Sequence, residues 1–201
     1  MPLSRDQAGE LFKPYATKLW RAVVELGFDR YKKNLYRATH RRTTVASMIH
    51  DLIVEGARTA FSEDSKSIRF IEVPGTDITL MEVEEAALVW FKKLTGKCCV
   101  HGNKTDLSQK LMSGSSDLPF IPPAATPLVV GYISNREETR VSRVSVVRPA
   151  GDRKRPEWFF DIGKPAQGMA AIPNVGGGNP EGETSTRIII IPGEQQSKLI
   201  N

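Results

Sequence analysis

The sequence contains few cysteines and few histidines. Two of its 201 residues are cysteine and three are histidine, which excludes a disulfide-rich scaffold. Cys98 and Cys99 are adjacent, where a disulfide would be strained, so we expect free thiols. No apolar run approaches the roughly 20 residues that span a bilayer, and the start lacks a signal-peptide core. We therefore expect a protein of the reducing cytoplasm without a membrane partner.

The composition is that of an ordinary globular protein, with a basic excess. It is 40% hydrophobic and 25% charged, and its 28 Lys and Arg outnumber its 23 Asp and Glu. The formal net charge is +5 and the sequence pI is about 9.3. Such a charge favours anionic partners without choosing between nucleic acid, membrane surface and acidic protein.

The first part of the chain, residues 1–62, has helical periodicity. Ser4 and Gln7 have the spacing of a capping box. Apolar side chains then follow one helical stripe at Phe12, Tyr15, Leu19, Val23 and Leu26. We expect Gly27 to end this helix in a left-handed conformation. Residues 43–61 form the clearest amphipathic helix of the sequence.

From residue 68 to residue 162 the pattern favours a sheet. Strands are expected at residues 68–73, 78–83, 128–133, 140–147 and 157–162. Residues 84–94 are ambiguous: their Glu and Ala favour helix, whereas residues 87–91 suit a buried strand, and we predict the strand. Residues 106–112 predict a short helix capped by Thr105, and residues 118–127 a proline-rich connector. The fold class is therefore α+β, with N-terminal helices packed on a mainly antiparallel sheet in one domain, residues 1–162.

Residues 163–201 predict a flexible tail rich in Gly and Pro. It contains four consecutive β-branched residues, Ile188, Ile189, Ile190 and Ile191. An exposed apolar segment of this kind tends to pair with other strands, so we expect it to pair with a sheet edge in this chain or in a partner protein.

Three short motifs resemble an uncharacterised family of small bacterial proteins. They are Arg-Thr-Thr-Val-Ala-Ser-Met-Ile-His-Asp at residues 42–51, Phe-Lys-Lys-Leu at residues 91–94, and the prolines of residues 118–124 before Val-Gly-Tyr at residues 130–132. The resemblance covers about residues 40–162 and departs from the family pattern at Thr44, where that pattern has a basic residue. It implies a strand at residues 87–94 and no known activity.

The densest basic segment provides the best candidate binding site. Its cationic side chains and one histidine are Arg30, Lys32, Lys33, Arg37, His40, Arg41 and Arg42. No acid interrupts them, and Tyr31 and Tyr36 lie among them. Such a segment can neutralise phosphates, although it can equally be a solvated surface or a partner for the protein's own acids. The following helix carries Asp51 and Glu55, which argues against base reading in a DNA groove.

A second basic cluster comprises Arg140, Arg143, Arg148, Arg153, Lys154 and Arg155. If it lies on the same side as the first segment, it extends the binding surface, with Trp158 as a stacking platform. The alternative is that these cations keep a turn soluble and that Trp158 belongs to the core.

Each catalytic interpretation of the sequence lacks a residue that its chemistry requires. His50 and Asp51 have the order of a metal-binding pair, but further ligands are missing, and Cys98, Cys99 and His101 complete no four-ligand site. A lysine of the Phe-Lys-Lys-Leu strand faces inward and needs an anionic partner, for which Glu82, Glu84 or a bound phosphate are candidates. A nuclease of the Asp/Glu/Lys type needs an acid two residues before that lysine, where this chain has Trp90 or Phe91.

We therefore predict a non-enzymatic, regulatory bacterial protein that binds nucleic acid or a nucleic-acid-associated partner through its basic surface. We predict no catalytic residue, metal or cofactor, and the chain allows a homodimer. The alternative is a protein-interaction component of a toxin-antitoxin, phage-related or defence system that uses its Ile-rich segment. A third hypothesis is a metal-dependent hydrolase centred on His50, Asp51 and Lys93.

Overall fold

The computed structural model of the chain describes residues 1–33, 42–100, 105–113, 122, 124–135, 137–150 and 155–164. Its helical elements are α1 (Arg5–Phe12), η1 (Lys13–Tyr15), α2 (Ala16–Trp20), η2 (Arg21–Phe28), α3 (Asp29–Lys32), α4 (Arg42–Ala60) and α5 (Asp106–Ser113). Its strands are β1 (Ile68–Glu72), β2 (Thr79–Val83), β3 (Ala87–Lys93), β4 (Thr126–Ser134), β5 (Val141–Pro149) and β6 (Pro156–Ile162).

Both predicted helix caps are confirmed. The Ser4 hydroxyl accepts a hydrogen bond from the Gln7 backbone N–H at 3.3 Å, and the Gln7 side chain accepts one from the Ser4 N–H at 2.9 Å. The Thr105 hydroxyl accepts from the backbone N–H of Ser108 at the start of α5. These reciprocal bonds satisfy backbone donors that a first helical turn leaves free.

The prediction that Gly27 ends a helix is wrong. Gly27 lies inside the π-helical segment η2, and the chain continues helically into α3. A Cβ atom at this position would lie 2.4 Å from Cγ1 of Ile53 on α4. Gly56 of α4 is in a similar position, because a Cβ there would lie 2.7 Å from Cβ of Leu26. The two glycines allow η2 and α4 to approach closely. Gly27 is therefore required by helix packing and does not mark a turn of the chain.

The six strands form one sheet in the order β1-β2-β3-β4-β5-β6. All neighbours are antiparallel except β3 and β4, which are parallel. The α+β prediction is confirmed, and the ambiguous segment is the strand Ala87–Lys93. Pro127 was expected in the connector but is the second residue of β4, opposite Leu88. A proline is tolerated near the start of a strand because the ladder there loses only one donor.

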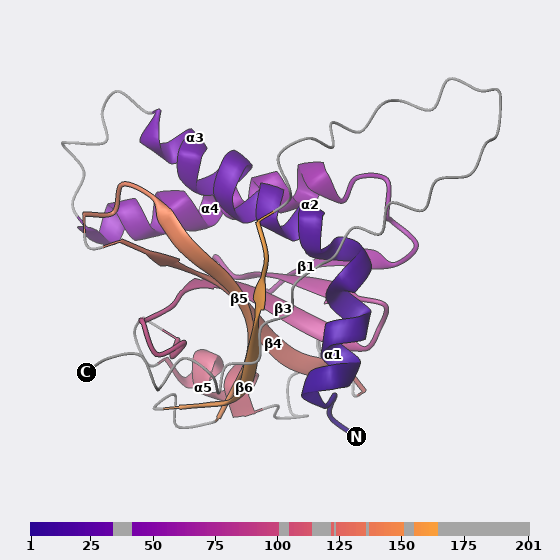
Figure 1. Cartoon of the computed structure of the whole chain (residues 1–201). Helices are drawn as coiled ribbons and strands as arrows, with labels where there is room; N and C mark the ends of the chain where they lie inside the picture. The colour runs from indigo at the N-terminus through magenta and orange to yellow at the C-terminus, as the bar shows by residue number, and fades with distance from the viewer. Residues whose placement is uncertain are drawn as a thin grey trace, which may run out of the picture.

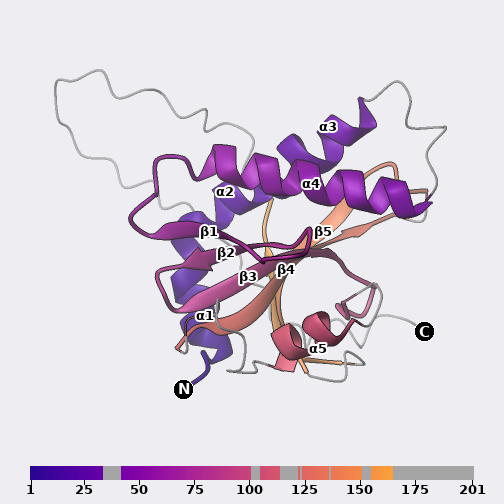
Figure 2. The same cartoon turned by 180° about the vertical axis from the view of Figure 1, so that it is seen from behind.

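The sheet is covered on both faces. Figures 1 and 2 show α1, α2, α3 and α4 on one face and α5 on the other. A parallel pair of strands requires a crossover connection, and α5 lies in the connection between β3 and β4.

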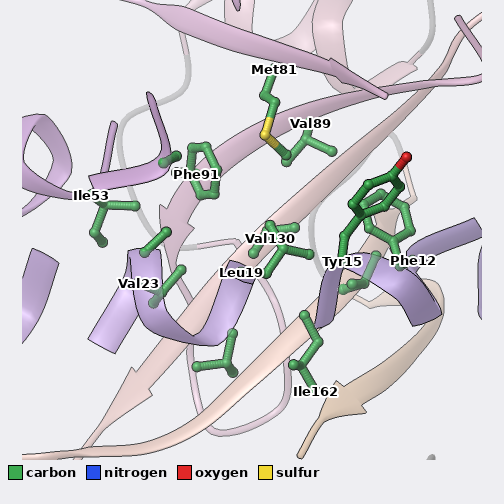
Figure 3. Close-up of a cluster of buried hydrophobic side chains, with 14 of the residues drawn as sticks. Phe12, Tyr15, Leu19, Val23, Ile53, Met81, Val89, Phe91, Val130 and Ile162 are labelled. Carbon is green, nitrogen blue, oxygen red and sulfur yellow. The ribbon is translucent and has the colours of Figure 1, made fainter. Parts of the chain in front are cut away.

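The larger core lies between the N-terminal helices and the sheet. Of the predicted apolar stripe, Phe12, Tyr15, Leu19 and Val23 are buried, whereas Leu26 is only half-buried. Figure 3 shows these four side chains close to side chains of the sheet. The labelled partners from the sheet and from α4 are Ile53, Met81, Val89, Phe91, Val130 and Ile162. A second core under the opposite face includes Leu80, Leu88, Trp90 and Leu111 of α5. In the part of the chain that the structure describes, no helix has the length and apolar character needed to cross a bilayer.

Candidate functional site

The parallel strands β3 and β4 end side by side, with Lys92 opposite Gly131 and Lys93 opposite Tyr132. In open sheets with parallel strands, ligands commonly bind beyond the carboxyl ends of these strands. Two lysines therefore stand at the end of the sheet where a binding site is expected, whereas Tyr132 is buried in the core. We call this region the β3–β4 end.

The lysines at this end have partners that differ from the predicted ones. Lys93 donates a hydrogen bond to the carboxylate of Glu138, which lies in the loop after β4. The predicted carboxylates contact other residues, since Oε2 of Glu82 accepts from Arg69 at 2.6 Å and Glu84 accepts from the Tyr15 hydroxyl at 2.7 Å. The carboxylate partner of Lys93 is therefore Glu138 and neither Glu82 nor Glu84, whereas a bound phosphate stays a prediction.

Helix α4 brings His50 to the same end. Burial lowers the pKa of His50, and the positive charge of Lys92 lowers it further. The neighbouring Asp51 and a backbone hydrogen bond with Phe91 act in the opposite direction. The Lys92 ammonium itself lies 3.9 Å from the centre of the Trp90 ring, a favourable cation–π distance. The positive charge of Lys92 beside His50 would also repel a metal ion bound there.

The short helix α3 is anchored beside the β3–β4 end through Phe28. The centre of the Phe28 ring lies 5.8 Å from the centre of the Tyr132 ring, in an edge-to-face arrangement. This contact joins the start of α3 to Tyr132 of β4, which lies opposite Lys93 in the sheet, although the two segments are far apart in sequence.

The cations of α3 differ in their electrostatic surroundings. Arg30 pairs with Glu55 of α4 at 2.9 Å, and Lys32 approaches Asp29 at 3.6 Å. Lys33 is exposed, and no carboxylate among the described residues pairs with it. The Arg30 side chain remains 55% exposed, and such surface pairs contribute only about 0–1 kcal/mol. An incoming anion can therefore compete with Glu55 for Arg30.

The loop between β4 and β5 supplies a further cation from a third region of the sequence. Asn135 closes this loop, because its side-chain oxygen accepts from the backbone N–H groups of Thr139 at 2.8 Å and Arg140 at 3.0 Å. Both views show the loop beside the first turns of α4 (Figures 1 and 2). Arg140 is exposed there, without an ion pair to any described carboxylate.

The second basic cluster is divided by the structure. Arg143 lies with its Nη2 2.7 Å from Sγ of Cys98 and its Nε 3.5 Å from Asp161, and Arg148 pairs with Glu157 at 2.5 Å. Their side chains are only 22% and 20% exposed. Both arginines therefore stabilise the sheet and contribute little to a binding surface.

Arg140 and Arg155 lie at opposite ends of β5. This strand has nine residues, so the two ends are roughly 25–30 Å apart. Arg155 therefore does not extend the basic surface at the β3–β4 end. Trp158 is half-buried and its ring stacks on Phe160 at 6.2 Å, packed against the core as the alternative interpretation expected.

Cys98 and Cys99 are free thiols, as predicted. Burial raises the pKa of Cys98, while the adjacent Arg143 acts to lower it. A guanidinium in contact with the sulfur disfavours a bound cation. Among the described residues, no group of three or more His, Cys, Asp and Glu could hold a metal ion.

Several predicted site residues fall outside what the structure describes. Arg37, His40, Arg41, His101, Arg153, Lys154, Ile188, Ile189, Ile190 and Ile191 belong to this set. The backbone of Arg42 begins α4, but its side chain is not described. The predictions for these residues, including the flexible tail and its Ile-rich strand, stay predictions.

The sequence pattern associates Arg140 with the first basic segment, as part of the second cluster, but it does not associate Lys92 and Tyr132 with that segment. The parallel pairing of β3 and β4 brings these two residues together, and no local sequence signal reports that pairing. The proline-rich, helix-containing connection between the strands was the available indication, because its length permits a crossover.

Compared with known proteins, the chain matches no family model, no curated protein and no solved structure. The resemblance to a family of small bacterial proteins therefore stays a prediction, and functional inference depends on the residues of the chain.

Proposed function

We propose that this protein binds nucleic acid through the β3–β4 end, with phosphates neutralised by cations from α3, β3 and the β4–β5 loop. The observation that supports this most directly is their convergence, through the Phe28–Tyr132 contact and the β3–β4 register, from three separate regions of the sequence. In the sequence, the segment that follows α3 contains Arg37, Arg41 and Arg42 and no acid.

The carboxylates at this end limit the strength of such binding. Asp29, Glu55 and Glu138 each approach one of the cations. Lys33 and Arg140 have no such partner among the described residues, and their charges are directly available to phosphates. We therefore expect moderate, strongly salt-dependent affinity that arises from counterion release.

Two arginines of the chain provide a matched test. Arg140 and Arg155 are both exposed, but only Arg140 lies at the β3–β4 end. Binding of a labelled single-stranded oligonucleotide would be measured by anisotropy over a range of salt concentrations. Arg140→Ala is expected to lower affinity and to reduce the slope of log K against log salt by about 1, whereas Arg155→Ala leaves both unchanged.

Equal effects of the two substitutions would contradict the proposed location, because they would indicate attraction by net charge alone. Binding that does not depend on salt would contradict the proposed function itself.

A further inference from the structure

A groove between α3 and α4 lies beside the proposed nucleic-acid surface. It has a volume of about 450 Å³ and is lined by Arg30, Lys33, Met48, Asp51 and Leu52. This volume is within the range of small-ligand sites. By contrast, the hollow beside Trp90 and Leu111 under the opposite face measures about 10 Å³, which is room for about one water molecule.

The lining of the groove combines three chemical properties. The α3 side contributes the positive charges of Arg30 and Lys33, which suit a phosphate. The α4 side contributes Met48, Asp51 and Leu52, which share one face of the helix because they are three and four residues apart. Two apolar side chains thus flank a carboxylate, opposite two cations.

These properties together fit a nucleotide with an unpaired base. The flat faces of a base can pack on Met48 and Leu52 while its phosphate lies near Arg30 and Lys33. Asp51 has only hydrogen-bond acceptors when ionised. It therefore selects a base that presents donors at its Watson–Crick edge, and it disfavours a base that presents an acceptor there.

We propose that this groove binds an unpaired guanine of a single-stranded nucleic acid, with Asp51 accepting hydrogen bonds from the N1–H and the 2-amino group. Guanine presents two adjacent donors at this edge. Adenine and cytosine each place an acceptor beside their donor, and thymine and uracil offer one donor between two acceptors. This inference rests on the proposed nucleic-acid binding and adds the form of nucleic acid and the base.

In the groove, the positive and negative charges nearly balance, so the groove alone does not bind a mononucleotide tightly. Arg30 pairs with Glu55, one helical turn after Asp51, so two carboxylates face two cations. Neighbouring phosphates of the same strand must therefore bind outside the groove, near Arg140, for the base to be held. An oligonucleotide is accordingly the appropriate probe.

The test compares two octamers of thymidine that differ in one central nucleotide, guanosine or inosine. Inosine lacks only the 2-amino group. The wild-type protein is expected to bind the guanosine octamer about tenfold more tightly, which is close to the lower end of what a hydrogen bond to a charged group contributes. The same pair in a uridine RNA octamer shows whether the preference extends to both kinds of strand.

Two isosteric substitutions distinguish a direct hydrogen bond from Asp51 to the base from a general effect of negative charge. Asp51→Asn is expected to remove the preference for guanosine over inosine. Glu55→Gln, which removes the same charge one turn away, is expected to keep it.

The outcomes distinguish the two proposals. Equal affinity for the two octamers, or a preference that persists in Asp51→Asn, overturns the guanine site but leaves nucleic-acid binding in place. Absence of binding to all octamers overturns both proposals. Loss of the preference in Asp51→Asn but not in Glu55→Gln supports the assignment.

Discussion

At the scale of single residues, His50 shows how the fold changes the chemistry of a side chain. It lies on α4 above the end of β3, where burial and the charge of Lys92 lower its pKa from the ordinary value of 6.5. Asp51 and the backbone of Phe91 only partly oppose these two effects. Protonated His50 is consequently disfavoured in the folded state relative to the unfolded chain.

This difference predicts a loss of stability in weak acid. Because the pKa of His50 is lower in the folded state, the unfolded chain binds more protons as the pH falls below about 6.5. The contribution of His50 to the free energy of unfolding is then complete above that pH, and it decreases as the pH falls toward the folded-state pKa. His50→Gln removes this titration, so its urea midpoint should fall less than that of the wild type between pH 7.5 and pH 5.5.

The comparison has a built-in control, since all other titrating groups are present in both proteins. Equal losses of stability would show that His50 is protonated as easily in the folded protein as in the unfolded chain. A reversed order, with the variant losing more, would indicate that Asp51 rather than Lys92 dominates its surroundings.

At the scale of elements, the contact between η2 and α4 is the most demanding in the helical layer. Gly27 and Gly56 both face the carbonyl oxygen of Ala22, and a Cβ atom on either glycine would lie 3.0 Å from it. The same Cβ atoms would lie 2.4 Å from Ile53 and 2.7 Å from Leu26. Backbone and inner side-chain atoms cannot move away from such contacts without moving a helix.

Gly27→Ala and Gly56→Ala are therefore expected to destabilise the protein by about 1–3 kcal/mol, the usual cost of an overpacked core. This direction opposes helix propensity, which by itself favours alanine over glycine by about 1 kcal/mol. Urea denaturation followed by circular dichroism measures the effect.

Gly96→Ala is the matched control, because a Cβ there has no atom within 4 Å. It should change the free energy of unfolding by less than about 0.5 kcal/mol, as surface substitutions usually do. If all three substitutions had similar effects, the close approach of the two helices would not be the cause.

The elements that were predicted correctly are those with a local signal. The Ser4–Gln7 cap, the amphipathic helix α4 and the antiparallel strands each follow from a short-range pattern. The turn between β2 and β3 has no such signal. Glu84 and Glu85 occupy it with positive φ values of 50° and 57°, where glycine or asparagine is usual. Because neither of these turn residues is present, the Glu and Ala of residues 84–94 also fit a helix.

The candidate site was predictable only in part, for a related reason. Basic residues of the α3 region can be recognised from composition, and Arg30 and Lys33 do lie together in the groove. Their association with Arg140 depends on the sheet order, and their pairing with carboxylates such as Glu55 depends on tertiary distances. Composition along the chain contains neither kind of information, so it overstated the available charge of Arg143 and Arg148.

At the scale of the whole molecule, the helical layer and the sheet share one core. Phe12 and Leu19 from the N-terminal helices belong to the same buried cluster as Val130 and Ile162 from the sheet (Figure 3). The Leu3 backbone N–H also donates to the Thr126 hydroxyl at 2.9 Å, which connects the first residues to the start of β4. Neither layer can expose its side of this core without exposing the other.

We therefore expect the helical layer and the sheet to unfold in one transition. Leu19 is fully buried in the helical layer, so Leu19→Ala should lower the free energy of unfolding by about 2–5 kcal/mol through lost contacts and a cavity. Far-ultraviolet circular dichroism and tryptophan fluorescence should shift to the same new urea midpoint, because coincident transitions indicate two-state unfolding. Separate midpoints, with only the helical signal shifted, would instead show that residues 68–162 form a sheet whose stability is independent of the helices above it.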